Sequence, residues 1–201
     1  MSLVRRILRV DAVLAGILIL SLSGCGINNI PTDYQRVQAS WSQVQNEYQR
    51  RADLIPNLVA TVKGYAKHEA DVLEAVTQAR AKVTQTTIPA NILSNPKAFH
   101  QFEQNQATLG GALSRLMMVT ENYPNLKADQ NFLTLQSQLE GTENRITVAR
   151  RDYILAVQQY NTELTTIPGR WYRSMFYSDK LPLQNFTATT QNAEQAPKVS
   201  F

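Results

Sequence analysis

The chain has 201 residues, of which 43% are hydrophobic and 18% are charged, and its formal net charge is +4. Residues 1–24 account for a net +2 of this charge, and the weakly basic remainder excludes a nucleic-acid-binding surface, which requires lysine and arginine concentrated on one face. The only cysteine is Cys25, so an internal disulfide is excluded as well.

The N-terminal residues have the order of a bacterial export signal. Three arginines precede an apolar run over residues 12–22, which is too short to span a membrane as a helix. Two small residues and then Cys25 follow this run, which is the pattern of lipoprotein processing. We therefore expect residues 1–24 to be a signal peptide, Cys25 to be lipidated as the mature N-terminus, and residues 25–31 to be a lipid-anchor tether.

The first predicted helix is long. Apolar residues recur at every third or fourth position from Tyr34 to Val83, with polar interruptions at Arg51 and Glu69. This spacing predicts one amphipathic helix. We expect Pro56, near its middle, to kink the helix rather than end it, because the apolar stripe continues across the proline in the same phase.

Two further apolar stripes, over residues 99–120 and 132–160, predict two more long helices, with Leu113 and Leu139 in the core. No stretch has the sustained alternation of a β-strand. Long amphipathic helices joined by short turns bury their stripes only against each other, so the sequence predicts an all-α fold. We expect an antiparallel bundle of three to four long helices over residues 32–168.

The character of the sequence changes after the bundle. Residues 169–177 combine four aromatic side chains with a methionine and two arginines, which predicts a short aromatic amphipathic segment. In the favoured role this segment caps the open end of the bundle, with Tyr172, Met175 and Phe176 packed inward. In the alternative role it is an anchor at the level of the lipid headgroups. The candidate interfacial residues are Trp171, Tyr172 and Phe176. Residues 178–201 are expected to be an extended or disordered tail.

Charged residues crowd the middle of the first and third predicted helices. In an antiparallel bundle these two clusters approach each other, so we expect an ion-pair network that fixes the register of the helices. The alternative is a surface on which a partner docks. The candidate residues for either role are Arg50, Arg51, Asp53, Glu140, Glu143, Arg145, Arg150 and Arg151.

Several blocks of the sequence resemble the LemA family. They are residues 41–44, 50–59, 61–69, 121–127, 139–146, 160–161 and 167–169. The resemblance covers roughly residues 26–177. It implies a bacterial, membrane-associated α-helical bundle, generally outside the cytoplasm, with no established enzymatic activity or cofactor. Many members of the family carry an uncleaved N-terminal membrane helix, and the lipoprotein-type N-terminus of this chain departs from that pattern.

The residues that could carry chemistry are few. The two histidines, His68 and His100, each have one nearby carboxylate, which falls short of the three or four ligands of a zinc site. We therefore expect no catalytic residues, no metal and no cofactor.

The expected function is that of a lipid-anchored, non-enzymatic scaffold that contacts a protein partner at the surface of a cell-envelope membrane. The alternatives are an envelope enzyme or enzyme subunit, and a homo-oligomeric envelope assembly. In a host with two membranes, Gly26 stands where an aspartate typically retains a lipoprotein at the inner membrane. We therefore favour the outer membrane.

Overall fold

The computed structural model describes residues 26–187. Its elements are α2 (Asn29–Tyr65), α3 (Ala70–Gln85), the 3-10 helix η2 (Ile92–Ser94), α4 (Pro96–Thr120), α5 (Pro124–Lys127), α6 (Gln130–Thr165) and α7 (Gly169–Phe176). This part of the chain contains no strand, and the predicted all-α fold is confirmed. The predicted signal peptide, Cys25 and residues 188–201 lie outside the described residues.

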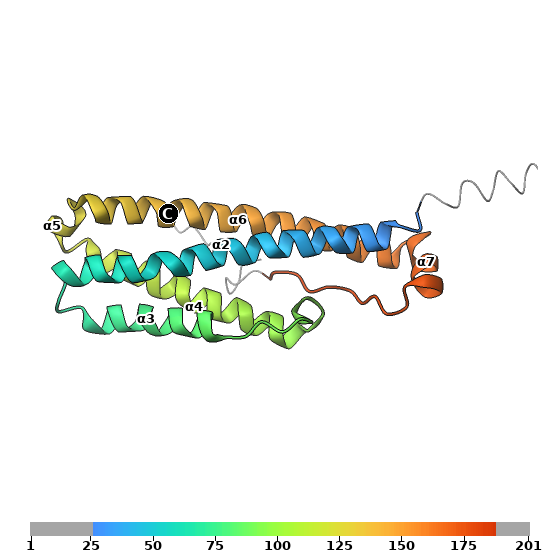
Figure 1. Cartoon of the computed structure of the whole chain (residues 1–201), viewed down its shortest axis with the longest axis horizontal. Coiled ribbons are helices and arrows are strands. Elements are labelled where there is room, and N and C mark those ends of the chain that lie inside the picture. Colours follow the sequence, from blue (N-terminus) through green and yellow to red (C-terminus); the bar gives the residue numbers. More distant parts are fainter. Residues whose placement is uncertain (1–25, 188–201) are drawn as a thin grey trace, which may run out of the picture.

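The four longest helices lie side by side and alternate in direction, so they form an elongated antiparallel bundle (Figure 1). Helix α2 packs along nearly the whole length of α6, and α3 packs on α4 and α2. Helices α4 and α6 do not approach each other closely through their backbones within this bundle. With 37 residues in α2, the rod is about 55 Å long.

The first predicted helix is in fact two helices. Helix α2 ends at Tyr65 and α3 starts at Ala70, so the prediction of one helix continuing to Val83 is wrong. The backbone leaves the helical region at Ala66, where φ is −116° and ψ is 59°. Helices α2 and α3 both bury an apolar stripe in the same core. Hydrophobic periodicity therefore does not reveal the turn between them.

Helix α2 continues through Pro56 with help from a neighbouring helix. Proline lacks the N–H group that would bond the carbonyl of Ala52, four residues earlier. Arg80 of α3 donates its Nε–H to that carbonyl at 2.8 Å. Because α3 folds back beside α2, it satisfies the acceptor that the proline leaves free, and the helix tolerates Pro56 in its interior.

The core consists of two hydrophobic clusters, one in each half of the rod. The cluster nearer α7 is rich in aromatic residues, and Trp41 lies within it, as the position of this residue in the first stripe predicts. The cluster nearer α5 is mostly aliphatic. It contains Leu113 and Leu139, which are 4% and 7% exposed, so the prediction that both are core residues is confirmed.

Truncating either leucine to alanine is expected to lower the free energy of unfolding by about 2–5 kcal/mol, because each leaves a cavity in a packed core. Urea unfolding followed by circular dichroism measures this loss. Leu155→Ala is the matched control, since Leu155 is 55% exposed on α6 and its truncation is expected to change stability by less than about 0.5 kcal/mol. Losses below about 1 kcal/mol at both core positions would contradict this packing.

Helix α6 begins at a cap that also ties it to α2. The Asp129 carboxylate accepts a hydrogen bond from the backbone N–H of Phe132 at 2.9 Å, and the Tyr65 hydroxyl donates to its other oxygen at 2.9 Å. Both bonds favour the ionised carboxylate, and they hold the pKa of Asp129 below its ordinary value. The cap therefore stabilises the protein in a pH-dependent way.

The substitution Asp129→Ala is expected to lower the melting temperature at neutral pH and to have less effect in acid. A lowered pKa in the folded state means that the stabilisation is present above the unfolded-state pKa of about 4 and is lost as the pH falls through the folded-state value. Thermal melts of both proteins between pH 7 and pH 3 test this. A difference in melting temperature that stays constant over that range would rule out the carboxylate as its source.

Candidate functional site

A layer of polar side chains separates the two hydrophobic clusters. Arg51 of α2 is its centre and is 4% exposed. Its guanidinium donates to Glu143 Oε1 of α6 at 3.0 Å, and to the side-chain and backbone oxygens of Gln106 of α4 at 2.7 and 3.1 Å. One arginine thus links three helices, while its buried Nε has no hydrogen-bond partner within the described structure.

A second ion pair lies one helical turn away. Arg145 of α6 donates to Glu47 of α2 at 3.1 Å and to the hydroxyl of Thr142 at 3.0 Å. The polar layer comprises Glu47, Arg51, Gln106, Thr142, Glu143 and Arg145. Sliding α6 along α2 by one turn would take Glu143 away from the buried guanidinium of Arg51 and leave this charge without its carboxylate partner, which is costly. We therefore expect the layer to fix the register of the helices.

The eight charged residues proposed from the sequence separate into two groups. Three belong to the polar layer: Arg51, Glu143 and Arg145. Of the others, Arg150 lies over the ring of Phe186 at 4.4 Å from its centroid. Arg50, Asp53, Glu140 and Arg151 are exposed and lie outside the layer. Helical geometry explains the division, because a residue one position from a buried one points about 100° away from it.

Sequence reasoning missed half of the polar layer, namely Glu47, Gln106 and Thr142. Two of these residues had a signal in the sequence, since Gln106 and Thr142 occupy positions in the apolar stripes of their helices. A polar residue within an apolar stripe is buried if the stripe is buried, and it then requires a partner. Arg51, Gln106 and Thr142 interrupt the apolar stripes of three different helices. These interruptions meet at one level of the bundle.

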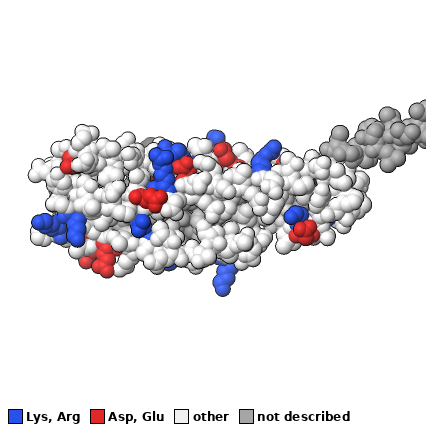
Figure 2. Space-filling view, viewed as in Figure 1, with Lys and Arg blue, Asp and Glu red and all other residues white. Residues whose placement is uncertain are grey.

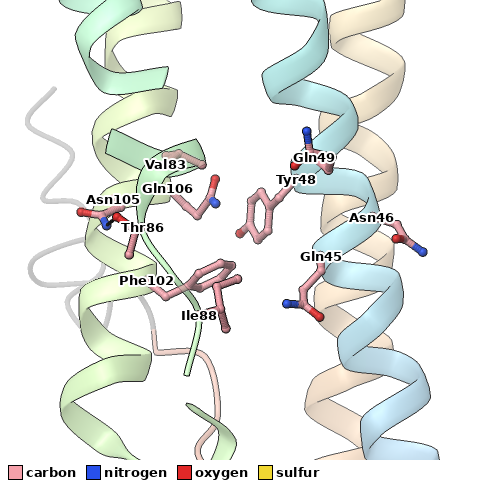
Figure 3. Close-up of a pocket in the computed structure, with 10 residues that line it drawn as sticks. All are labelled: Gln45, Asn46, Tyr48, Gln49, Val83, Thr86, Ile88, Phe102, Asn105 and Gln106. Atoms are coloured by element: carbon pink, nitrogen blue, oxygen red, sulfur yellow. Dashed lines mark hydrogen bonds between the residues drawn. The ribbon is translucent and has the colours of Figure 1, made fainter. Parts of the chain in front are cut away.

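A cavity of about 330 Å³ lies beside the polar layer, between α2, α4 and the chain that follows α3. Figure 3 shows Tyr48 of α2 and Gln106 of α4 pointing toward each other across it, whereas Asn46 points away. Its lining combines apolar side chains with amides and two hydroxyl groups, and includes no carboxylate, imidazole or amine. Burial raises the pKa of the Tyr48 hydroxyl, which stays protonated. A ligand in such a cavity would be held by van der Waals contacts and by hydrogen bonds between uncharged groups.

Residues 26–187 contain neither a cluster of metal ligands nor a helix that could span a membrane. No three side chains of the types His, Cys, Asp and Glu converge there in a way that could hold a metal ion. None of the helices described is long and apolar enough to cross a membrane. Figure 2 shows that charged side chains of both signs are scattered over the face in view, with wide uncharged areas between them.

The end of the bundle at α7 carries exposed apolar side chains. Tyr172 packs against the aromatic cluster, whereas Met175 and Phe176 are 64% and 59% exposed. The expectation that these two residues pack inward with Tyr172 is therefore wrong. Helix α7 is held close to α6 at Gly169, where a Cβ would collide with the backbone carbonyl of Glu163. Within α7, Tyr172 thus faces the bundle, whereas Met175 and Phe176 in its last turn face away from it.

Five exposed apolar residues belong to α7 and the chain next to it, and we call this set the apolar end patch: Ile167, Trp171, Met175, Phe176 and Leu181. The first described residue, Gly26, lies against Tyr172 and Pro168 at the same end (Figure 1). Helix α2 begins at Asn29 and Ile30 is fully buried, so the tether predicted over residues 25–31 is shorter than expected. The end patch and the position that follows Cys25 are thus neighbours.

Comparison with known proteins agrees with the resemblance noted in the sequence. The model of the LemA family matches residues 40–201. The chain belongs to the LemA family. It is 27% identical over 160 residues to magnetosome protein MamQ 2 of Paramagnetospirillum magneticum, covering 72% of this chain and 59% of that protein. It is 24% identical over 139 residues to protein LemA of Metamycoplasma hominis, covering 69% and 59%.

The matched region therefore spans less than two thirds of the length of these relatives. Membership of the family supports an envelope-associated protein of the LemA and MamQ type.

Proposed function

We propose that this LemA-family protein is a lipid-anchored, non-enzymatic scaffold that stands on a cell-envelope membrane by its α7 end and presents the helical bundle to a protein partner. The observation that carries the proposal is the position of the apolar end patch beside Gly26, directly after Cys25. An acyl anchor at Cys25 would bring this patch, and no other part of the rod, to the bilayer surface.

The chemistry of the end patch suits an interface. Trp171, Met175 and Phe176 are apolar and exposed, and Arg170, which is also exposed, directly precedes Trp171 and would contact lipid phosphates in this orientation. Tryptophan favours the headgroup level because its indole ring combines an apolar body with a polar N–H group, and Trp171 is such a residue. An amphipathic segment added to acyl chains gives two membrane signals, which anchor a protein more stably than one.

The polar layer supports a scaffold rather than a catalyst. Arg51 donates to both Glu143 and Gln106, and Arg145 donates to Glu47, so these groups already have partners within the bundle. A rigid rod with a fixed register keeps its far end at a constant height above the membrane. In a host with two membranes, we assign the protein to the outer one, because Gly26 follows Cys25.

Emission of Trp171 in the unlipidated chain tests the membrane contact. In a Trp41→Phe background, Trp171 is the only tryptophan, and we expect its fluorescence to shift to the blue when vesicles containing anionic lipid are added. Salt should reduce the shift, since arginine contributes to binding. The matched control is Trp171→Phe, in which the buried Trp41 should report no shift. An unchanged Trp171 spectrum would count against the proposed contact.

A further inference from the structure

Residues 181–187, which we call the C-terminal arm, run back from α7 along the gap between α4 and α6 (Figure 1). The sequence placed them in an extended or disordered tail, yet they are packed on the bundle. They form no helix and no strand. The arm lies at the level of the aromatic cluster, where the backbones of α4 and α6 do not approach closely and the two helices meet through side chains such as Phe99 and Tyr153.

The bundle holds the arm through the arm's main chain. Asn161 of α6 acts as a clamp on Leu183, because its amide nitrogen donates to the Leu183 carbonyl at 3.0 Å and its oxygen accepts from the Leu183 N–H at 2.9 Å. The next residue is held from both sides. The Tyr153 hydroxyl donates to the Gln184 carbonyl at 2.7 Å, and the Gln184 N–H donates to the Leu93 carbonyl at 2.7 Å.

A buried carboxylate completes this set of bonds. Glu103 of α4 is 8% exposed and accepts a hydrogen bond from the Thr187 N–H at 3.1 Å. Burial, with Glu103 as a nearby negative charge, raises the pKa of Tyr153, so its hydroxyl remains a donor. Main-chain groups are present in every peptide, and bonds to them therefore select an extended backbone and not a particular sequence.

Two side chains of the arm, which are three residues apart in the sequence, fill apolar pockets. Leu183 is 7% exposed in the aromatic cluster. The ring of Phe186 lies 5.1 Å from the ring centroid of Phe99 and 5.4 Å from that of Tyr153, and the Arg150 guanidinium covers it. These two anchors give the site its side-chain specificity, which is for an apolar residue followed at the third position by an aromatic one.

The gap between α4 and α6 continues past the arm as two cavities. The first, of about 180 Å³, lies beside Phe186 and includes Glu103 and Arg51 in its lining. The second, of about 720 Å³, follows along the same two helices and includes Leu113 and Leu139. Gly110 lines both cavities. The groove is therefore longer than the segment that occupies it among the described residues.

We propose that the groove between α4 and α6 is a binding site for an extended segment of a partner protein, and that the C-terminal arm is its intramolecular occupant. The partner segment carries an apolar residue and, three positions later, an aromatic residue. It replaces the arm on the clamp formed by Asn161 and continues into the two cavities beyond Phe186.

The position of the C-terminal arm determines how much free energy a partner segment needs to replace it. It comes after the last helix, so its release breaks no helical hydrogen bond. A tethered segment has an effective concentration in the millimolar range, which a partner must overcome. Contacts deeper in the two cavities beyond Phe186, which residues 181–187 do not fill, supply that advantage.

Fluorescence anisotropy with a labelled peptide of the arm's own sequence, Leu-Pro-Leu-Gln-Asn-Phe-Thr, tests the inference on the full mature chain in detergent. Phe186→Ala removes one anchor of the arm and is expected to increase the affinity for the peptide about tenfold or more over the wild type, by removing the tethered competitor. Phe176→Ala, an exposed aromatic residue outside the groove, should leave the affinity at the wild-type level. Adding Asn161→Ala to Phe186→Ala should abolish the gain.

A measurement on the wild-type protein does not depend on the folding of any variant. In amide hydrogen exchange followed by NMR, saturating peptide should accelerate exchange at Leu183, Gln184 and Thr187 and leave the core of α2 unchanged. Equal peptide affinity in the wild type and a folded Phe186→Ala chain, or unchanged exchange at all three amides, would overturn the inference. This proposal rests on the scaffold function, but the assay contains no vesicles, so its failure is separate from failure of the membrane contact.

Discussion

Replacing Trp41 by alanine is expected to lower the free energy of unfolding by about 3–5 kcal/mol, because the ring lies at the centre of the aromatic cluster. The indole is 6% exposed. Its centroid lies 5.7 Å from that of Phe99, 5.1 Å from that of Phe102 and 5.5 Å from that of Tyr153. Truncation removes contacts with α4 and α6 together, and it opens a cavity that the surrounding helices cannot close.

The other tryptophan is the matched control. Trp171 is 57% exposed in the apolar end patch, so Trp171→Ala is expected to change stability by less than about 0.5 kcal/mol. Urea unfolding followed by circular dichroism compares the two variants without relying on tryptophan emission. Equal losses for both would mean that the aromatic cluster does not hold the bundle together.

Replacing Arg51 by alanine is expected to lower stability by about 1–3 kcal/mol for each buried acceptor that loses its donor. The Gln106 side chain and backbone carbonyl are buried and lose their bonds to the guanidinium. Arg51→Met, which retains most of the volume, should lose less than Arg51→Ala. The difference between these two losses of stability separates the contribution of lost packing from that of the unpaired acceptors.

Arg50 provides the control for this experiment, because it is the same residue type one position earlier and is exposed. Arg50→Ala is expected to change stability by less than about 0.5 kcal/mol. Guanidinium chloride would screen charge effects, so urea is the suitable denaturant. If Arg50→Ala and Arg51→Ala had the same effect, the polar layer would have no special role in fixing helix register.

Hydrophobic periodicity was sufficient to predict the long helical stretches, because each long helix buries one face along its length. It could not locate the turn after Tyr65, since α2 and α3 present the same kind of stripe to one core. The hydrogen bond from Arg80 to the carbonyl freed by Pro56 depends on that turn, and it too was beyond the reach of a pattern along one helix.

The candidate sites were predictable only in part, for a related reason. The positions of Arg51 and Gln106 within apolar stripes indicate burial, but which residues face each other depends on the relative register of three helices. The C-terminal arm lacks periodicity, because its main chain is bound by side chains such as Asn161 and not by a regular ladder. The only signal of the arm in the sequence is the spacing of Leu183 and Phe186, which are three residues apart.

The orientation of the rod on the membrane is the most direct test of the central proposal. Single cysteines introduced as Ser174→Cys in α7 or Asn125→Cys in α5 would carry a fluorophore at opposite ends, about 50 Å apart along the bundle. The lipidated protein in vesicles that contain a headgroup quencher should lose emission from the label at position 174 and keep it at position 125. Equal quenching of both labels, or stronger quenching at position 125, would contradict a bundle that stands on the bilayer by its α7 end.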